Sequence, residues 1–244
     1  MKPDTSTAVR GLELLWGATE RPSRGPKQGL TSDAVVRAAI ELADADGLAA
    51  LSMRKVAERL GVGAMTLYTY VPAKDELVAL MVDAALGERP VPVGEGWREL
   101  LASVARGLWE LYLRHPWLLA ASSERTPIGP NALVNYEREL STLSGTGLDS
   151  TAMVSVISLV AGYVAGAARS AVQVIEEERR TGQTREEWWH QTSPVLDRLI
   201  DYASYPTVVS VADADSHAHG PAENFAFGLE RVLDGIEALI ATRR

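Results

Sequence analysis

Residues 52–74 read SMRKVAERLGVGAMTLYTYVPAK, the pattern of two short helices separated by a glycine-containing turn. Apolar residues of the first helix recur at three- and four-residue spacing and therefore share one face: Met53, Val56, Ala57 and Leu60. Gly61 stands where this helix should end, because glycine adopts a left-handed backbone conformation without steric cost. A second helix is expected over residues 64–70, with Leu67 and Val71 facing inward. Two short helices joined in this way predict a helix-turn-helix.

The predicted second helix carries hydroxyl groups where an ordinary surface helix would carry Glu and Lys. In a DNA-binding helix-turn-helix this second helix lies in the major groove, and hydroxyls suit contacts with phosphates and base edges. The residues predicted to face bases or backbone are Ala64, Met65, Thr66, Tyr68, Thr69 and Tyr70, and those predicted to contact phosphates are Ser52, Arg54 and Lys74. The spacing alone also fits two packed helices in an all-helical protein that never touches DNA.

Several linked motifs in this part of the chain resemble the DNA-binding domain of the tetracycline-repressor (TetR) family. They are ALSMRKVAERLGV over residues 50–62, TLYTYV over residues 66–71 and KDEL over residues 74–77. The similarity extends over about residues 29–86, roughly a quarter of the chain. The resemblance implies a homodimeric, ligand-responsive transcriptional regulator that binds a double-stranded DNA operator and is usually a repressor.

Composition excludes several classes of protein. The chain has 244 residues, of which 46% are apolar and 23% charged, so it is expected to be globular. It has no cysteine, which excludes disulfides and thiolate metal sites and fits a cytoplasmic location. No signal peptide is recognisable, and no apolar run is judged to approach the length of a membrane span. The expected protein is therefore soluble and not associated with a membrane.

The net charge of −8 is unevenly distributed and argues against indiscriminate nucleic-acid binding. Residues 1–80 hold ten basic and ten acidic residues, whereas residues 81–244 hold 14 and 22. A basic segment rich in Pro and Gly includes Arg21, Arg24 and Lys27. Residues 1–29 are expected to form a flexible basic arm that either enters the adjacent minor groove or remains a solvated tail.

Two folded domains are predicted after the arm, and both are all-α. Residues 30–88 form the three-helix DNA-binding domain, and residues 95–244 form a larger helical domain for ligand binding and dimerisation. The helices expected in the larger domain cover residues 97–114, 131–143, 149–180, 184–203 and 223–242, with a loop over residues 206–221.

The longest and the last predicted helices are candidates for a dimer interface. The resemblance implies that two such helices from each subunit form a four-helix bundle. The long helix has glycines that suit a close approach of another backbone, and the last helix has one apolar stripe. The predicted interface residues are Gly162, Gly166, Phe225, Leu229, Val232 and Ile236. Both helices could instead be ordinary core helices.

An effector site is expected among the helices after residue 95, because small-molecule pockets are mostly apolar and aromatic. The proposed lining residues are Trp109, Tyr112, Trp117, Tyr136, Met153, Ile157 and Gln173. Most of these could equally be core residues. The acidic, His-bearing arrangement that tetracycline–magnesium binding requires is not evident.

Catalytic and metal-binding patterns are not recognisable, so no enzyme activity, cofactor or metal is expected. His217 and His219 lie two residues apart in a predicted loop, where solvated side chains are more common than metal ligands. The predicted function is a homodimeric DNA-binding regulator, most simply a repressor released by a small apolar ligand. Two alternatives remain open: a transcriptional activator, and a small-molecule-binding or interaction protein with a structural helix-turn-helix.

Overall fold

The computed structural model of the chain describes residues 5–17, 30–121, 128–212 and 220–243. These residues form helices and connecting turns without any strand, so the predicted all-α class is confirmed. The N-terminal part contains α1 (Thr5–Leu15), α2 (Ser32–Asp46), η1 (Leu48–Ala50), α3 (Met53–Arg59), α4 (Ala64–Tyr68) and α5 (Lys74–Leu86). The C-terminal part contains α6 (Gly96–Arg114), α7 (Leu118–Ala121), α8 (Pro130–Ser141), α9 (Ser150–Thr181), α10 (Arg185–Leu199), η2 (Tyr202–Ser204), α11 (Pro206–Ala212) and α12 (Pro221–Ala241).

The helix-turn-helix forms as its sequence predicts. Ser52 caps α3, because its hydroxyl accepts a hydrogen bond from the backbone N–H of Lys55. Gly61 ends the helix with φ +68°, the left-handed conformation that glycine tolerates. The inward residues Leu67 and Val71 are fully buried in the core, and α4 packs against α3. The second helix ends at Tyr68, two residues earlier than predicted.

The N-terminal helix α1 is longer than the sequence indicated. The sequence predicted a flexible arm over residues 1–29, whereas residues 5–15 form α1. It packs against α5, and the indole N–H of Trp16 donates a hydrogen bond to the backbone carbonyl of Ile128, 3.1 Å away. The first part of the segment expected to be an arm is therefore a helix docked beside the junction of the two domains.

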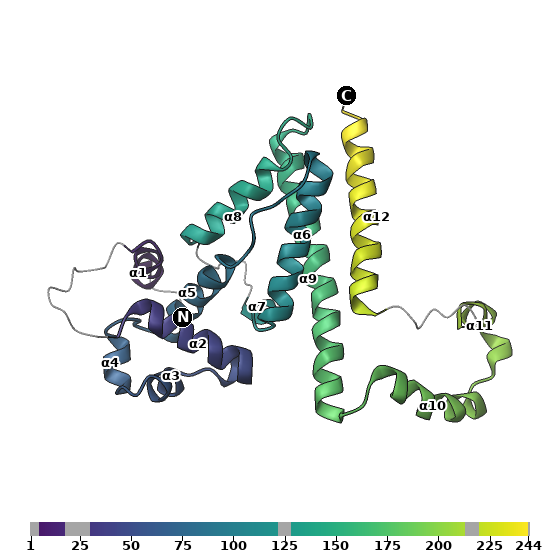
Figure 1. The fold of residues 1–244 in the computed structure, drawn as a ribbon, viewed down its shortest axis with the longest axis horizontal. Coiled ribbons are helices and arrows are strands. Elements are labelled where there is room, and N and C mark those ends of the chain that lie inside the picture. Colours follow the sequence, from purple (N-terminus) through teal and green to yellow (C-terminus); the bar gives the residue numbers. More distant parts are fainter. Residues whose placement is uncertain (1–4, 18–29, 122–127, 213–219, 244) are drawn as a thin grey trace.

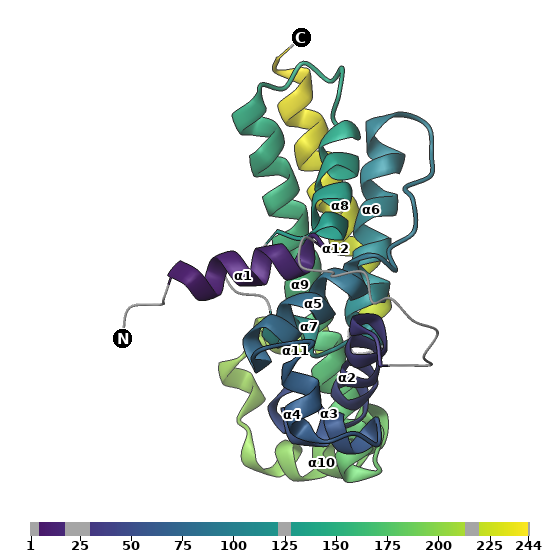
Figure 2. The same cartoon turned by 90° about the vertical axis from the view of Figure 1, so that its left-hand side faces the viewer.

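Three long helices, α6, α9 and α12, run side by side in the C-terminal domain (Figures 1 and 2). Their contact is apolar and aromatic: the ring of Phe225 stacks with those of Trp109 and Tyr163, with centroids 4.2 and 6.0 Å apart. The Tyr163 hydroxyl donates to the carbonyl of Phe225 at 2.7 Å. This packing fixes the last helix against the longest one.

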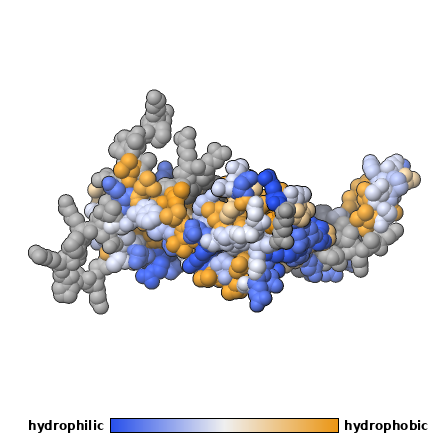
Figure 3. All heavy atoms as spheres, turned by 90° about the horizontal axis from the view of Figure 1, so that it is seen from above, coloured by the Kyte–Doolittle hydropathy of each residue, from blue (hydrophilic) through white to orange (hydrophobic). Residues whose placement is uncertain are grey.

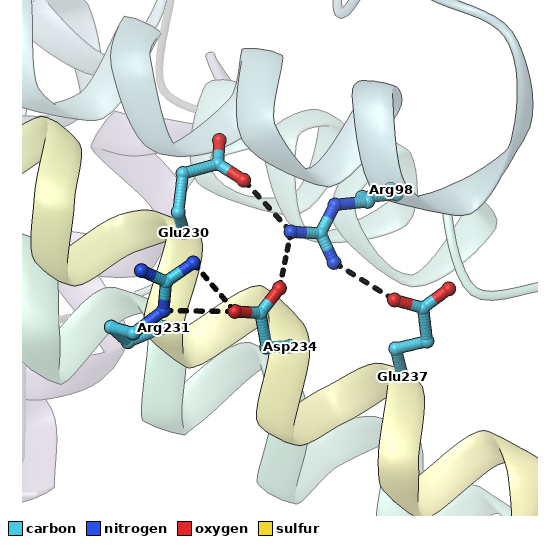
Figure 4. A network of polar contacts seen from close by, with 5 residues as sticks. All are labelled: Arg98, Glu230, Arg231, Asp234 and Glu237. Atoms are coloured by element: carbon cyan, nitrogen blue, oxygen red, sulfur yellow. Dashed lines mark hydrogen bonds and ion pairs between the residues drawn. The ribbon is translucent and has the colours of Figure 1, made fainter.

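A charged cluster joins the first turn of α6 to α12 at the edge of this bundle (Figure 4). The Arg98 guanidinium contacts carboxylates on three turns of α12, at distances of 2.7 to 3.2 Å: Glu230, Asp234 and Glu237. Hydrogen bonds from Arg98 and Arg231 lower the pKa of the Asp234 carboxyl below its usual value. The cluster is largely exposed, so it contributes orientation more than stability.

Helices α10 and α11 extend away from the bundle (Figure 1). No residue of α10 is buried, and α11 occupies part of the segment predicted to be a loop. Apolar residues are visible on the surface of these two helices (Figure 3). The exposed residues are Trp188, Val195, Leu199, Tyr205, Val208 and Val211.

One expectation about apolar segments was wrong. Helix α9 contains an 18-residue window of mean hydropathy 1.8, so it is long and apolar enough to cross a membrane by length and composition. Only 28% of that window is buried within the subunit. Most of this apolar part of α9 is therefore not covered by other residues of its own subunit.

Candidate nucleic-acid interface and its link to the C-terminal domain

The outward face of α4 presents a compact set of uncharged side chains. Met65 is 80% exposed and Tyr68 43% exposed, and Thr66 and Thr69 are also exposed. The Thr69 hydroxyl donates to the carbonyl of Thr66 at 2.6 Å, which leaves the hydroxyls of Thr66 and Tyr68 as the outward donors. Apolar and hydroxyl side chains are among those that can contact base edges in the major groove.

Two of the predicted contact residues on this helix-turn-helix lie partly inside. Ala64 is half-buried at the start of α4, and Tyr70 packs against the domain core because it follows the end of the helix. Lys74 begins α5, with its ammonium 3.5 Å from the carbonyl of Leu48. Ser52 accepts the α3 capping bond, so its own hydroxyl proton is still available to a phosphate.

Basic side chains around the helix-turn-helix are paired with carboxylates. Arg54 contacts Glu58 at 3.0 Å, Lys55 contacts Asp46 at 3.5 Å and Arg59 contacts Glu41 at 2.7 Å. Residues 30–88 contain five basic and nine acidic residues, so the folded domain is acidic. The predicted cationic arm residues Arg21, Arg24 and Lys27 lie outside the described residues, as do His217 and His219.

Asp83 connects α5 to the N-terminus of α8. Its carboxylate is buried and accepts from the backbone N–H groups of Asn131 at 3.3 Å and Ala132 at 2.9 Å, and from the Asn131 amide at 3.1 Å. The side-chain amide of Asn135 donates to the carbonyl of Leu86 at 2.8 Å. Gly129 is required here because a Cβ would clash with the Asp83 carboxylate. These hydrogen bonds therefore fix the C-terminal half of α5 to α8.

A buried ion pair continues this connection beyond α5. The Arg89 guanidinium lies 2.6 Å from Glu139 on α8, and the two side chains are only 7% and 14% exposed. Because a buried charge is costly without its partner, this pair holds the segment after α5 against α8.

A second junction joins the end of α6 to the DNA-binding domain through a buried histidine. His115 Nδ1 lies 2.7 Å from Asp44 on α2, and Nε2 lies 3.1 Å from Glu88 after α5. The indole N–H of Trp117 donates to the same Asp44 oxygen at 2.8 Å. Burial raises the pKa of the Glu88 carboxyl, but hydrogen bonds from His115 and Arg114 outweigh it and leave that pKa below its usual value.

The predicted effector-site residues are spread over several environments. Trp117 donates its indole N–H to Asp44 at the junction with the DNA-binding domain, and Trp109 stacks on Phe225 in the core. Tyr136 is 40% exposed on α8, and Gln173 is exposed on α9. Ile157 is buried, whereas Tyr112 and Met153 are half-buried and pack against the core.

The predicted dimer residues also divide into two groups. Gly162 and Gly166 face open space on α9, where an added Cβ would meet nothing within 4 Å. Phe225, Leu229 and Ile236 are at most 6% exposed and Val232 is half-buried, all packed within their own subunit. The prediction for these buried residues needs correction, because the apolar stripe of α12 is used by α6 and α9.

Sequence comparison identifies known relatives of both domains. A model of the family described as bacterial regulatory proteins, tetR family, matches residues 35–81, and one described as tetracyclin repressor-like, C-terminal domain, matches residues 89–240. The HTH-type transcriptional repressor DrrR1 of Streptomyces coeruleorubidus is 46% identical over 97% of this chain and 88% of its own length.

Solved structures agree with this similarity. Apo ActR from Streptomyces coelicolor superposes with a TM-score of 0.71 at 28% identity, covering 90% of this chain and all of that chain. ActR in complex with actinorhodin gives a TM-score of 0.71 at 31% identity, covering 87% of this chain and 99% of that chain.

Proposed function

Because the chain belongs to the TetR family and is a transcriptional repressor with a ligand-binding C-terminal domain, we propose that it binds its operator as a homodimer and is released by a small apolar effector. The observation that carries this proposal is the outward face of α4, where Met65, Thr66 and Tyr68 are exposed beside the buried anchor Leu67. Operator binding places the activity in the cytoplasm, where the DNA is.

In this proposal α4 lies in the major groove and α3 crosses the phosphate backbone. Ala64, Met65, Thr66, Tyr68, Thr69 and Tyr70 face bases or sugar–phosphate, and Ser52, Arg54 and Lys74 position the domain on phosphates. The acidic balance of the folded domain supports a role for Arg21, Arg24 and Lys27 in neutralising phosphates.

The double substitution Tyr68→Ala with Lys74→Ala is expected to weaken operator binding by roughly a hundredfold at fixed salt. The reason is that a homodimer loses four contacts, and small contact losses multiply in the binding constant. Fluorescence anisotropy on a duplex from the chain's own upstream region measures the effect. Tyr136→Ala removes an equally exposed tyrosine far from α4 and should leave affinity unchanged. Retained affinity in the double variant would contradict the proposed contact surface.

The exposed face of α9 supports a homodimer. Small and polar residues follow one another on this face at helical spacing: Ser155, Ser158, Gly162, Gly166, Arg169 and Gln173. Glycines without neighbours allow another helix to approach closely, and polar residues such as Arg169 and Gln173 favour a protein partner over lipid. We assign α9 and the exposed side of α12 to this interface. Phe227 is 66% exposed on that side.

Replacing Gly162 and Gly166 with glutamate is expected to produce a folded monomer. A Cβ added at either position meets nothing within 4 Å, and glutamate favours the helix more than glycine does. A partner helix, however, would have to bury two charges. Sedimentation velocity measures the assembly, with Ser141→Glu on exposed α8 as the matched control. A double variant that still sediments as a dimer would exclude this face.

The effector is proposed to bind among α6, α8 and α9, whose core side chains include Tyr112, Met153 and Ile157. Differential affinity for a state with a different spacing of the two α4 helices would release the operator. ActR binds actinorhodin, so actinorhodin is a suitable first probe. The test is a footprint of the upstream region with and without this compound, where loss of protection supports ligand release.

A further inference from the structure

Helix α4, the proposed recognition helix, lacks the side chains that read guanine and adenine by paired hydrogen bonds. Those contacts are made mainly by Arg or Lys to guanine and by Asn or Gln to adenine. Residues 64–70, AMTLYTY, include none of these four types. Among the nearby cations, Arg54, Lys55 and Arg59 belong to α3 and are already paired with carboxylates. Lys74 lies outside α4, at the start of α5, with its ammonium 3.5 Å from the carbonyl of Leu48.

The most prominent group on this face is apolar. Met65 is the second residue of α4 and is 80% exposed, more than any other large apolar residue described. N-terminal residues of a recognition helix are those that reach base edges. In the major groove only thymine presents a methyl group, at C5, so an apolar side chain at this place has one natural partner.

We propose that Met65 is a specificity-determining residue that reads a thymine 5-methyl group in each half-site of the operator. This inference rests on the proposed DNA-binding function and deepens it. The flexible thioether chain covers the methyl group, while the hydroxyls of Thr66 and Tyr68 serve neighbouring polar edges or phosphates. Recognition at this base pair therefore depends on burial of apolar surface rather than on hydrogen bonds.

The experiment uses full-length protein and a duplex selected by that protein from random double-stranded DNA. Each thymine in the selected site is replaced in turn by deoxyuridine, which removes only the 5-methyl group and keeps base pairing. One thymine in each half-site is expected to cost about fourfold in affinity when replaced, the usual effect of one buried methyl group. Replacement in both half-sites together should cost about sixteenfold.

The same duplexes are then measured with three variants. In Met65→Ala the effect of deoxyuridine should fall below twofold, because the group that contacts the methyl is missing. In Met65→Leu, which stays apolar, and in Thr66→Ala, which alters the next side chain, the fourfold effect should persist. Circular dichroism confirms that each variant is folded, and Met65 is exposed enough to be replaced without disturbing the core.

Three outcomes distinguish a failure of the proposed role of Met65 from a failure of the proposed DNA-binding function. Enrichment of a sequence in which no thymine is sensitive to deoxyuridine would overturn the role of Met65 and leave DNA binding intact. A sensitivity that remains fourfold in Met65→Ala would do the same, since another side chain would then contact the methyl. Failure to enrich any sequence would overturn the DNA-binding function itself.

Discussion

Replacing Asp83 with alanine is expected to lower the free energy of unfolding by about 3 kcal/mol. The carboxylate is 6% exposed and accepts three hydrogen bonds at the start of α8, two of them from backbone N–H groups. Alanine would leave these donors buried without acceptors. Urea unfolding followed by circular dichroism measures the loss.

Two further variants separate capping from a general charge effect. Asp75→Ala removes an exposed acid from the first turn of α5, where the loss is expected to be about 0.5 kcal/mol. Asp83→Asn keeps one acceptor oxygen and should fall between the two. Equal stability of Asp83→Ala and Asp75→Ala would show that Asp83 does not hold α8.

Replacing Arg89 with alanine is expected to cost about 4 kcal/mol, because it leaves Glu139 charged in a buried site. Substituting both partners, as Arg89→Met with Glu139→Leu, removes the charge as well as the pair and should restore most of the stability. Thermal and urea unfolding of the single and double variants measure the difference.

An exposed pair on α3 provides the comparison. Arg54 and Glu58 have side chains 84% and 59% exposed, so Arg54→Ala should cost no more than about 0.5 kcal/mol. If Arg89→Ala were as mild as Arg54→Ala, the pair with Glu139 would have no structural role. If the double variant were as unstable as Arg89→Ala, packing rather than charge would explain the loss.

Helices with strong local signals were predictable from the sequence. Asp149 caps α9 through its carboxylate, and the observed bounds of α6 and α9 lie within one residue of those predicted. Helix α11 was predicted to be part of a loop because residues 206–221 are low in helix signals and rich in Asp, Ser and His. The early start of α1 has a similar cause, since its first residues, TSTA, show no helical apolar pattern.

The outward face of α4 followed from the inward anchors Leu67 and Val71, because two buried positions fix the orientation of a short helix. The junctions could not be predicted in the same way. His115 lies 71 residues from Asp44 and 27 from Glu88, and no local spacing connects them. The stripe on α12 shows the limit clearly: periodicity indicated that Phe225 and Leu229 are covered, but not that their own subunit covers them.

The bonds between Asp83 and the start of α8 have a consequence for chimaeric regulators. A crossover placed at the end of α5 would take Asp83 from one parent and Asn131 and Gly129 from the other. Gly129 tolerates no Cβ beside that carboxylate, so a mismatched parent would distort the graft. Exchange of operator preference between relatives should therefore succeed when the crossover precedes Asp83, with the last turn of α5 inherited together with the effector-binding half.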